Sequence, residues 1–97
     1  MTYNLTFLES AQREWKKLNS DIREQFKVKL AQRLATPRVN KDKLSGMKDC
    51  YKIKLRTVGY RLVYKVIDAR LVVQVIAVGP RNKNYIYKVA QDRFTDL

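Results

Sequence analysis

A basic β-hairpin is the feature that most constrains this chain, and it occupies residues 50–66, CYKIKLRTVGYRLVYKV. Side chains of a strand point alternately to its two faces, so Tyr51, Ile53 and Leu55 predict an apolar face for the first strand. The same alternation resumes after a turn at residues 57–59, which predicts a second strand with its apolar side on the same face. The opposite face would carry five cations and no carboxylate, namely Lys52, Lys54, Arg56, Arg61 and Lys65.

This arrangement requires an even number of unpaired residues in the turn, because a slip of one residue would move Arg61 into the core. A sheet face with five cations is costly to leave without a partner of opposite charge, so we expect it to bind a polyanion. The composition agrees, with 21 Lys plus Arg against 9 Asp plus Glu and a net charge of +12. Such an excess favours nucleic acid or an acidic protein as the partner.

The length of 97 residues predicts one domain, residues 1–97, and the 45% hydrophobic content predicts a packed core instead of a disordered basic tail. A single cysteine, Cys50, cannot form an internal disulfide, which favours a reducing cytoplasm. The N-terminus lacks the pattern of a signal peptide, and no apolar run approaches the ~20 residues of a membrane span. We therefore expect a cytoplasmic protein without membrane contact.

The remaining periodicities predict a compact α+β domain. A strand pattern is followed by two stretches with apolar residues at spacing three and four, as in amphipathic helices. After the basic hairpin comes a run that is apolar on both faces apart from Gln74, typical of a covered central strand, and then a last helix. The prediction is a small, mainly antiparallel four-stranded sheet with an N-terminal helix hairpin and a short C-terminal helix. These segments are residues 3–8, 9–18, 22–34, 71–78 and 86–94.

The residue types limit the chemistry that the basic face can perform. The chain has no histidine, and its scattered carboxylates make a metal site improbable. Cleavage of RNA by its own 2′-hydroxyl needs a base, stabilisation of the phosphorane and an acid for the leaving 5′-oxygen. Without histidine, Lys, Tyr or a carboxylate must supply the base.

Neighbouring lysines offer one source of that base. Lys52 and Lys54 would lie about 7 Å apart on one strand face. Like charges at that spacing lower a lysine pKa, and several such neighbours bring it from about 10.4 toward about 8. Tyr87 is a second source, since nearby cations would favour its anion. Arg61 and Arg81 would hold the phosphate and its developing charge.

Pattern alone leaves a binding surface as the alternative to an active site. A basic sheet face more often binds than catalyses, and tyrosines between the cations stack bases in many RNA-binding proteins. The polar connector, residues 38–49, has the same ambiguity. Its cations either face solvent in a loop without a binding role or make additional contacts with phosphates.

Several motifs, taken together, resemble the RelE toxins of the RelE/ParE superfamily. They are YKIKLR (51–56), GYRLVY (59–64), Val78-Gly79 followed by Arg81, and Tyr87, and the likeness extends through Glu14-Trp15, VKL (28–30), Pro37-Arg38 and LSGM (44–47). The resemblance implies a microbial-ribonuclease-like fold and an mRNA endonuclease that acts in the ribosomal A site. It implies a 2′,3′-cyclic phosphate and a 5′-hydroxyl as products, with no cofactor and no metal.

The same resemblance implies the partners. A RelB-type antitoxin would neutralise the basic surface, and the complex would repress its own operon, so operator DNA is contacted only through that complex. The other partners would be the 70S ribosome, through its A site and 16S rRNA, and mRNA, in a bacterial or archaeal cytoplasm. Three alternatives remain: a ParE-like gyrase inhibitor, a non-catalytic RNA- or ribosome-binding module, and a protein that acts chiefly as half of a repressor complex.

The resemblance also implies a set of site residues. The catalytic set falls on Lys52, Lys54, Arg61, Arg81 and Tyr87. Arg61 would stabilise the phosphate and transition state, with Tyr87 or Lys52 as base and Arg81 or Lys54 as acid. Further RNA contacts are expected from Arg56, Lys65, Lys41, Lys43, Lys48 and Lys83. Pro80 departs from the basic residue expected there, and it would displace Arg81 or remove one cation from the RNA path.

Overall fold

The computed structural model describes residues 2–82 and 85–95. In chain order, these residues form strands and helices that match the predicted succession. They are β1 (Asn4–Phe7), α1 (Glu9–Lys16), α2 (Ser20–Ala35), β2 (Cys50–Leu55), β3 (Tyr60–Ile67), β4 (Val72–Pro80) and α3 (Tyr85–Thr95), with short 3₁₀ turns at Asn40–Asp42 and Asp68–Arg70.

The strands of the described residues make one four-stranded sheet in the order β1-β4-β3-β2. β2 pairs with β3 and β3 with β4 in antiparallel fashion, whereas β1 lies parallel to β4. The prediction of a mainly antiparallel sheet is confirmed. The apolar run at 71–78 forms β4, which lies between two neighbouring strands and is buried on both faces.

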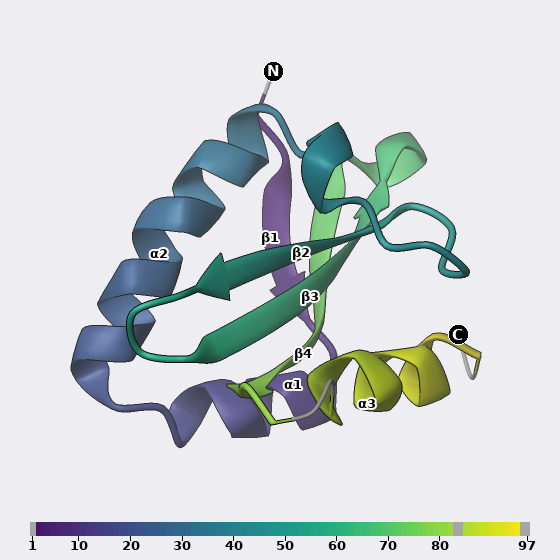
Figure 1. Cartoon of the computed structure of the whole chain (residues 1–97). Helices are drawn as coiled ribbons and strands as arrows, with labels where there is room; N and C mark the ends of the chain where they lie inside the picture. The colour runs from purple at the N-terminus through teal and green to yellow at the C-terminus, as the bar shows by residue number, and fades with distance from the viewer. Residues whose placement is uncertain (1, 83–84, 96–97) are drawn as a thin grey trace.

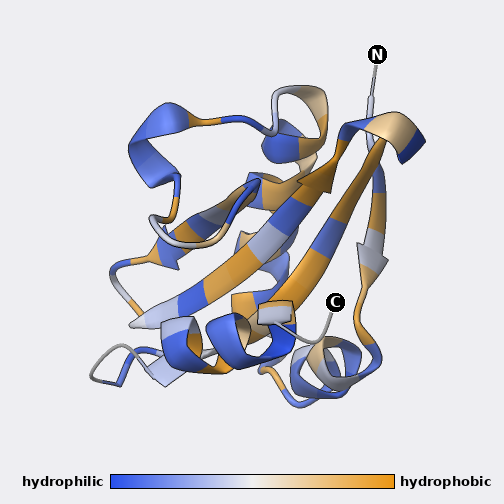
Figure 2. Ribbon diagram, turned by 90° about the vertical axis from the view of Figure 1, so that its right-hand side faces the viewer, coloured by the Kyte–Doolittle hydropathy of each residue, from blue (hydrophilic) through white to orange (hydrophobic). Residues whose placement is uncertain are grey.

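Helices cover both faces of this sheet (Figure 1). On one face, Phe26 and Leu30 of α2 pack with the inward residues of β2 and β3, and Ala11 of α1 joins the same core. On the other face, Ile86 and Ala90 of α3 form a smaller core with the connector between α2 and β2. In Figure 2, hydrophilic bands interrupt the hydrophobic colour along the strands, as alternation requires.

The N-terminal helices follow one another directly and cover the same face, as predicted. Asn19 begins α2, because its side-chain oxygen accepts a hydrogen bond from the Asp21 N–H at 2.8 Å. The two helices diverge at a wide angle and do not lie side by side as a closely packed pair (Figure 1). The physical reason is that they cover different strands: α1 packs mainly on β4, whereas α2 packs on β2.

The connector between α2 and β2 is held by apolar and ionic contacts. Met47 is buried and Leu44 packs beside it, so these two residues hold the connector against the smaller core. Arg38 pairs with Asp49 at 3.0 Å and with Asp68 at 2.7 Å, so this cation has a structural role. Within the described part of the chain, no helix is long and apolar enough to cross a membrane.

Candidate active site

The turn between β2 and β3 sets the register of the basic hairpin. Lys54 lies opposite Arg61 and Leu55 opposite Tyr60, so residues 56–59 form a loop of even length. Gly59 in this loop has φ +69°, a left-handed conformation that favours glycine. The predicted register is confirmed, and Arg61 shares a face with Lys54.

A β-bulge in β4 brings a second arginine to the same face. Val63 pairs with Ala77 but Tyr64 pairs with Val75, which leaves Ile76 as an extra residue. Ile76 and Ala77 therefore both pack toward α3, although they are consecutive. The bulge shifts the alternation of β4 by one residue, so positions 79 and 81 join the face of Arg61.

Arg81 keeps its place despite the preceding proline. Its backbone N–H donates to the Gly59 carbonyl at 2.5 Å, which ties the end of β4 to the hairpin turn. Pro80 is the last residue of β4, opposite Tyr60, and it lines a hollow against α1 on the other side of the strand. The expected displacement of Arg81 by Pro80 is not found. A proline is tolerated at this strand end because its missing N–H breaks no bond of a central ladder.

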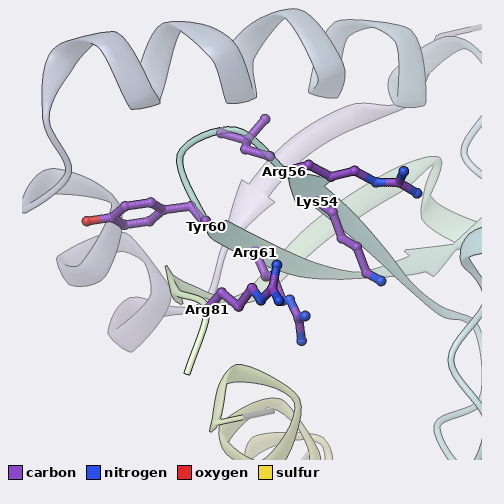
Figure 3. A pocket seen from close by; sticks show the side chains of 7 residues that line it. Lys54, Arg56, Tyr60, Arg61 and Arg81 are labelled. Atoms are coloured by element: carbon purple, nitrogen blue, oxygen red, sulfur yellow. The ribbon is translucent and has the colours of Figure 1, made fainter. Parts of the chain in front are cut away.

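The cations surround a shallow pocket of about 250 Å³ at the open end of the sheet (Figure 3). Lys54 of β2, Arg61 of β3 and Arg81 after β4 extend toward the same space. Arg56 also lines the pocket, but it belongs to the turn and points away from the two arginines. Of the described residues that line this pocket, none is a carboxylate.

Tyr87 of α3 completes the cluster from above the sheet. The Arg61 guanidinium carbon lies 4.9 Å from the centre of its ring, and Lys52 Nζ lies 6.0 Å away. The Tyr87 hydroxyl is buried, and no described residue makes a well-formed hydrogen bond to it. The five predicted catalytic residues therefore come from β2, β3, the end of β4 and α3, and they meet on one face.

The cluster lowers the pKa of one of its lysines. The charge of Lys52 is the largest cause of the lowered pKa of Lys54, followed by partial desolvation and the charges of Arg61 and Arg56. The expected mechanism, repulsion between cations on one strand face, is confirmed for Lys54. This amine is therefore more easily deprotonated than an ordinary lysine.

Tyr87 behaves in the opposite way to our expectation. Burial raises its pKa, and the nearby Arg61 offsets only part of that rise. The prediction that cations would make Tyr87 ionise readily is wrong. Burial takes away more of the solvation energy of the phenolate than its attraction to the Arg61 guanidinium compensates. Tyr87 is thus a neutral phenol at physiological pH.

A second cationic hollow of about 490 Å³ adjoins the first and shares Lys54, Leu55 and Arg56 with it. It lies between β2 and α2, and its other cations are Lys41 and two residues that sequence reasoning missed, Lys29 and Arg33. Arg33 is paired with Asp42 at 2.5 Å. The spacing of four between Gln25, Lys29 and Arg33 was the available signal, because it places them on one face of α2.

The other predicted RNA contacts are more scattered. Lys65 lies 5.3 Å from the centre of the Phe94 ring, at the far end of the hairpin face and beneath α3. Lys43 pairs with Tyr51 through an isolated bridge, and both Lys43 and Lys48 are exposed on the connector. Neither Lys43 nor Lys48 lines the two cationic hollows. Lys83 lies outside the described residues.

Comparison with known proteins decides the family. Residues 5–85 match the family described as ParE toxin of type II toxin-antitoxin system, parDE. The mRNA interferase toxin RelE of Escherichia coli K12 is 55% identical over 93 residues, which cover 96% of this chain and 98% of that protein. This chain is a member of the RelE toxins, within the RelE/ParE superfamily. A putative RelE-like toxin protein of E. coli is 47% identical over a similar span.

Solved structures of RelE proteins agree with this membership. A double arginine-to-alanine mutant of E. coli RelE in the free state superposes with a TM-score of 0.88 at 54% identity, covering 96% of this chain and 98% of that one. RelE in the intact E. coli RelBE toxin–antitoxin complex gives a TM-score of 0.80 at 57% identity, covering 84% and 99%. The RelE fold and the predicted resemblance are thus confirmed.

Proposed function

We propose that this RelE family member is the toxin of a type II toxin–antitoxin system and inhibits translation by cutting mRNA in the ribosomal A site. The observation that carries the proposal is the convergence of Lys52, Lys54, Arg61, Arg81 and Tyr87 on one face. The 55% identity to an mRNA interferase supports it. We treat residues 1–97 as one toxin domain.

The proposed reaction is attack of the 2′-oxygen on the adjacent phosphorus. A base removes the 2′-hydroxyl proton, the new P–O bond forms, and the bond to the 5′-oxygen breaks as an acid protonates that oxygen. The products are a 2′,3′-cyclic phosphate and a 5′-hydroxyl. We assign Arg61 and Arg81, which line the same pocket, to the phosphate and to the charge that develops on its oxygens.

The proton-transfer roles follow from the pKa directions. The lowered pKa of Lys54 makes its ammonium a better acid than an ordinary lysine, so we assign it to the leaving oxygen. Arg81 is assigned to the phosphate and not to proton transfer, because a guanidinium is not deprotonated in proteins. Lys52 and Tyr87 stay alternative bases. The raised pKa of Tyr87 argues against a phenolate as the base. The choice stays open because strongly coupled groups titrate as a unit.

Dependence on the ribosome has a physical reason. A cluster without a histidine base needs a substrate that is already aligned, and alignment contributes as much as ~7–11 kcal/mol to such a step. The ribosome would hold the codon in an attackable shape, while exposed cations contact RNA. Arg56, Lys41 and Lys29 around the second hollow are the best placed for these contacts.

Control of the toxin is proposed to come from a RelB-type antitoxin. E. coli RelE has been solved in complex with RelB. The +12 charge of this chain favours an acidic partner that covers the basic face. We propose that the complex represses its own operon and that the toxin acts in the cytoplasm, where ribosomes translate.

Primer extension on an mRNA in a purified translation system tests the proposal, with ribosomes present or omitted. We expect cuts within the A-site codon that need ribosomes and disappear in Arg81→Ala and Tyr87→Phe. Arg70→Ala is the charge-matched control, because Arg70 is exposed in the turn before β4, at the opposite end of that strand from Arg81.

Other outcomes have defined meanings. Cuts on naked RNA would indicate a free ribonuclease. Salt-sensitive ribosome binding without cuts would indicate a binding module or an enzyme weakened by Pro80, and Pro80→Lys would separate the two by restoring activity only in the second case. Inhibition of gyrase without RNA cleavage would support a ParE-like function.

A further inference from the structure

A half-buried ion pair connects α1 and α3 across the edge of the sheet. Arg93 donates to both carboxylate oxygens of Glu14, at 2.8 and 3.0 Å, and the two side chains are only 23% and 29% exposed. Arg93 also donates to the Ile76 carbonyl at 2.9 Å, and Glu14 accepts from the Val78 N–H at 3.3 Å. The pair therefore binds the backbone of the β4 bulge.

The ion pair takes the place of a neighbouring strand on β4 beyond the point where β1 ends. β1 pairs with β4 only as far as Phe7 and Val75. Beyond Val75, Arg93 binds the Ile76 carbonyl and Glu14 binds the Val78 N–H. These backbone groups lie at the bulge that brings Arg81 to the face of the site. A bidentate arginine–carboxylate pair also fixes orientation, because both groups are planar.

The other end of α3 has a tight apolar contact. Ile86 sits directly on Gly79, where an added Cβ would lie 2.7 Å from Ile86 Cδ1. The described part of α3 spans 11 residues, and among them only Ile86 and Ala90 are fully buried. A helix this short is marginal by itself, so its orientation depends on packing: Ile86 and Ala90 are buried in the smaller core, and Tyr87, Val89 and Phe94 pack against that core.

We propose that Glu14 and Arg93 are positioning residues that set the orientation of Tyr87 against Arg61 and Lys52. The inference rests on the proposed function, in which Tyr87 belongs to the reacting cluster. Tyr87 follows Ile86 directly, so a rotation of α3 about the Ile86 contact moves its ring relative to Arg61, now 4.9 Å away. The Glu14–Arg93 pair, bound to β4 near the other end of α3, prevents that rotation.

Two conservative substitutions test the role. Glu14→Gln keeps the shape and an acceptor for the Val78 N–H but removes the charge, and Arg93→Lys keeps the charge but loses the planar fork. We expect the single-turnover cleavage rate at saturating toxin to fall about 10- to 100-fold, with little change in ribosome affinity. Glu9→Gln, which breaks the exposed Glu9–Arg13 pair on the same helix, should leave the rate unchanged.

Combination with Tyr87→Phe separates positioning from general destabilisation. If the pair acts through the Tyr87 hydroxyl, Glu14→Gln should lower the residual single-turnover rate of Tyr87→Phe, too slow to give cuts by primer extension, little further. Losses that multiply, or losses matched by the unfolded fraction in a denaturation curve at the assay temperature, would overturn the inference.

A spectroscopic measurement decides the inference even if the chain proves not to cut mRNA. Protein labelled with 3-fluorotyrosine gives a ¹⁹F resonance for Tyr87, assigned by its disappearance in Tyr87→Phe. We expect this resonance to move in Glu14→Gln and Arg93→Lys and to stay in place in Glu9→Gln. An unmoved resonance in the first two variants would refute the positioning role, whereas absent cleavage by the wild type would refute only the proposed function.

Discussion

Gly79→Ala is predicted to destabilise the fold through one side chain, Ile86. The added Cβ would lie 2.7 Å from Ile86 Cδ1 and 3.4 Å from Cγ1, whereas carbon atoms in contact normally lie about 3.5–4.0 Å apart. Gly79 is buried within β4, so the clash cannot be relieved toward solvent. Relief requires an off-rotamer Ile86 or an outward shift of α3.

The expected magnitude is the difference of two effects. Overpacking of this kind costs about 1–3 kcal/mol. Replacing glycine by alanine in a strand also stabilises the fold by about 0.4–1 kcal/mol, because alanine lowers the conformational entropy of the unfolded chain. The net loss in the free energy of unfolding should therefore be about 1 kcal/mol, and at most about 2.6 kcal/mol. An outward shift of α3 should also slow mRNA cleavage, because it moves Tyr87 away from Arg61.

Ile86→Val provides the matched control, because valine lacks the Cδ1 atom that makes the clash. Alone it should cost about 0.5–1.5 kcal/mol, as is usual for a buried Ile→Val change. Urea denaturation of the wild type, both single variants and the double variant measures the coupling between the two sites. We expect the double variant to lose about 1 kcal/mol less free energy of unfolding than the two single variants lose together. Additive losses would refute the contact as the cause.

Three further predictions concern charge and pH. In single-turnover assays, the cleavage rate should decline as pH rises through the lowered pKa of Lys54, because the acid then loses its proton. Lys54→Arg should move that decline to higher pH. A decline at the same pH in both proteins would exclude Lys54 as the acid. Burial raises the pKa of the Cys50 thiol to about 11, so the folded chain keeps a proton that the unfolded chain releases from about pH 9 upward. The free energy of unfolding should fall between about pH 9 and 11, and less so in Cys50→Ala, as urea titrations at a series of pH values would show. Lys29→Ala and Lys41→Ala should each weaken RNA binding and reduce the slope of log affinity against log salt by about 0.7; unchanged slopes would place RNA outside the second hollow.

Local patterns predicted much of the fold, since alternation and helical spacing are properties of neighbouring residues. They located the strands, the helices, the apolar face of the hairpin and the even turn that keeps Arg61 beside Lys54. They failed for the ionisation of Tyr87, because the degree of burial beneath α3 depends on packing between distant segments. They also missed Lys29, whose partner surface on β2 is remote in sequence.

The order of the residues accounts for the excess of positive charge, the cationic face of the hairpin and the resemblance to RelE toxins. The resemblance also implied Arg81 as a site residue, but the way in which Arg81 reaches this face follows only from the pairing of the strands. The run at 71–78 is apolar on both sides apart from one glutamine, so its pattern contains no signal for a bulge at Ile76. Pairing with β3 reveals the extra residue, and Glu14 and Arg93, 79 residues apart in sequence, bind its flanking backbone. The geometry of the site is therefore a property of the register between strands and of the helix that rests on them.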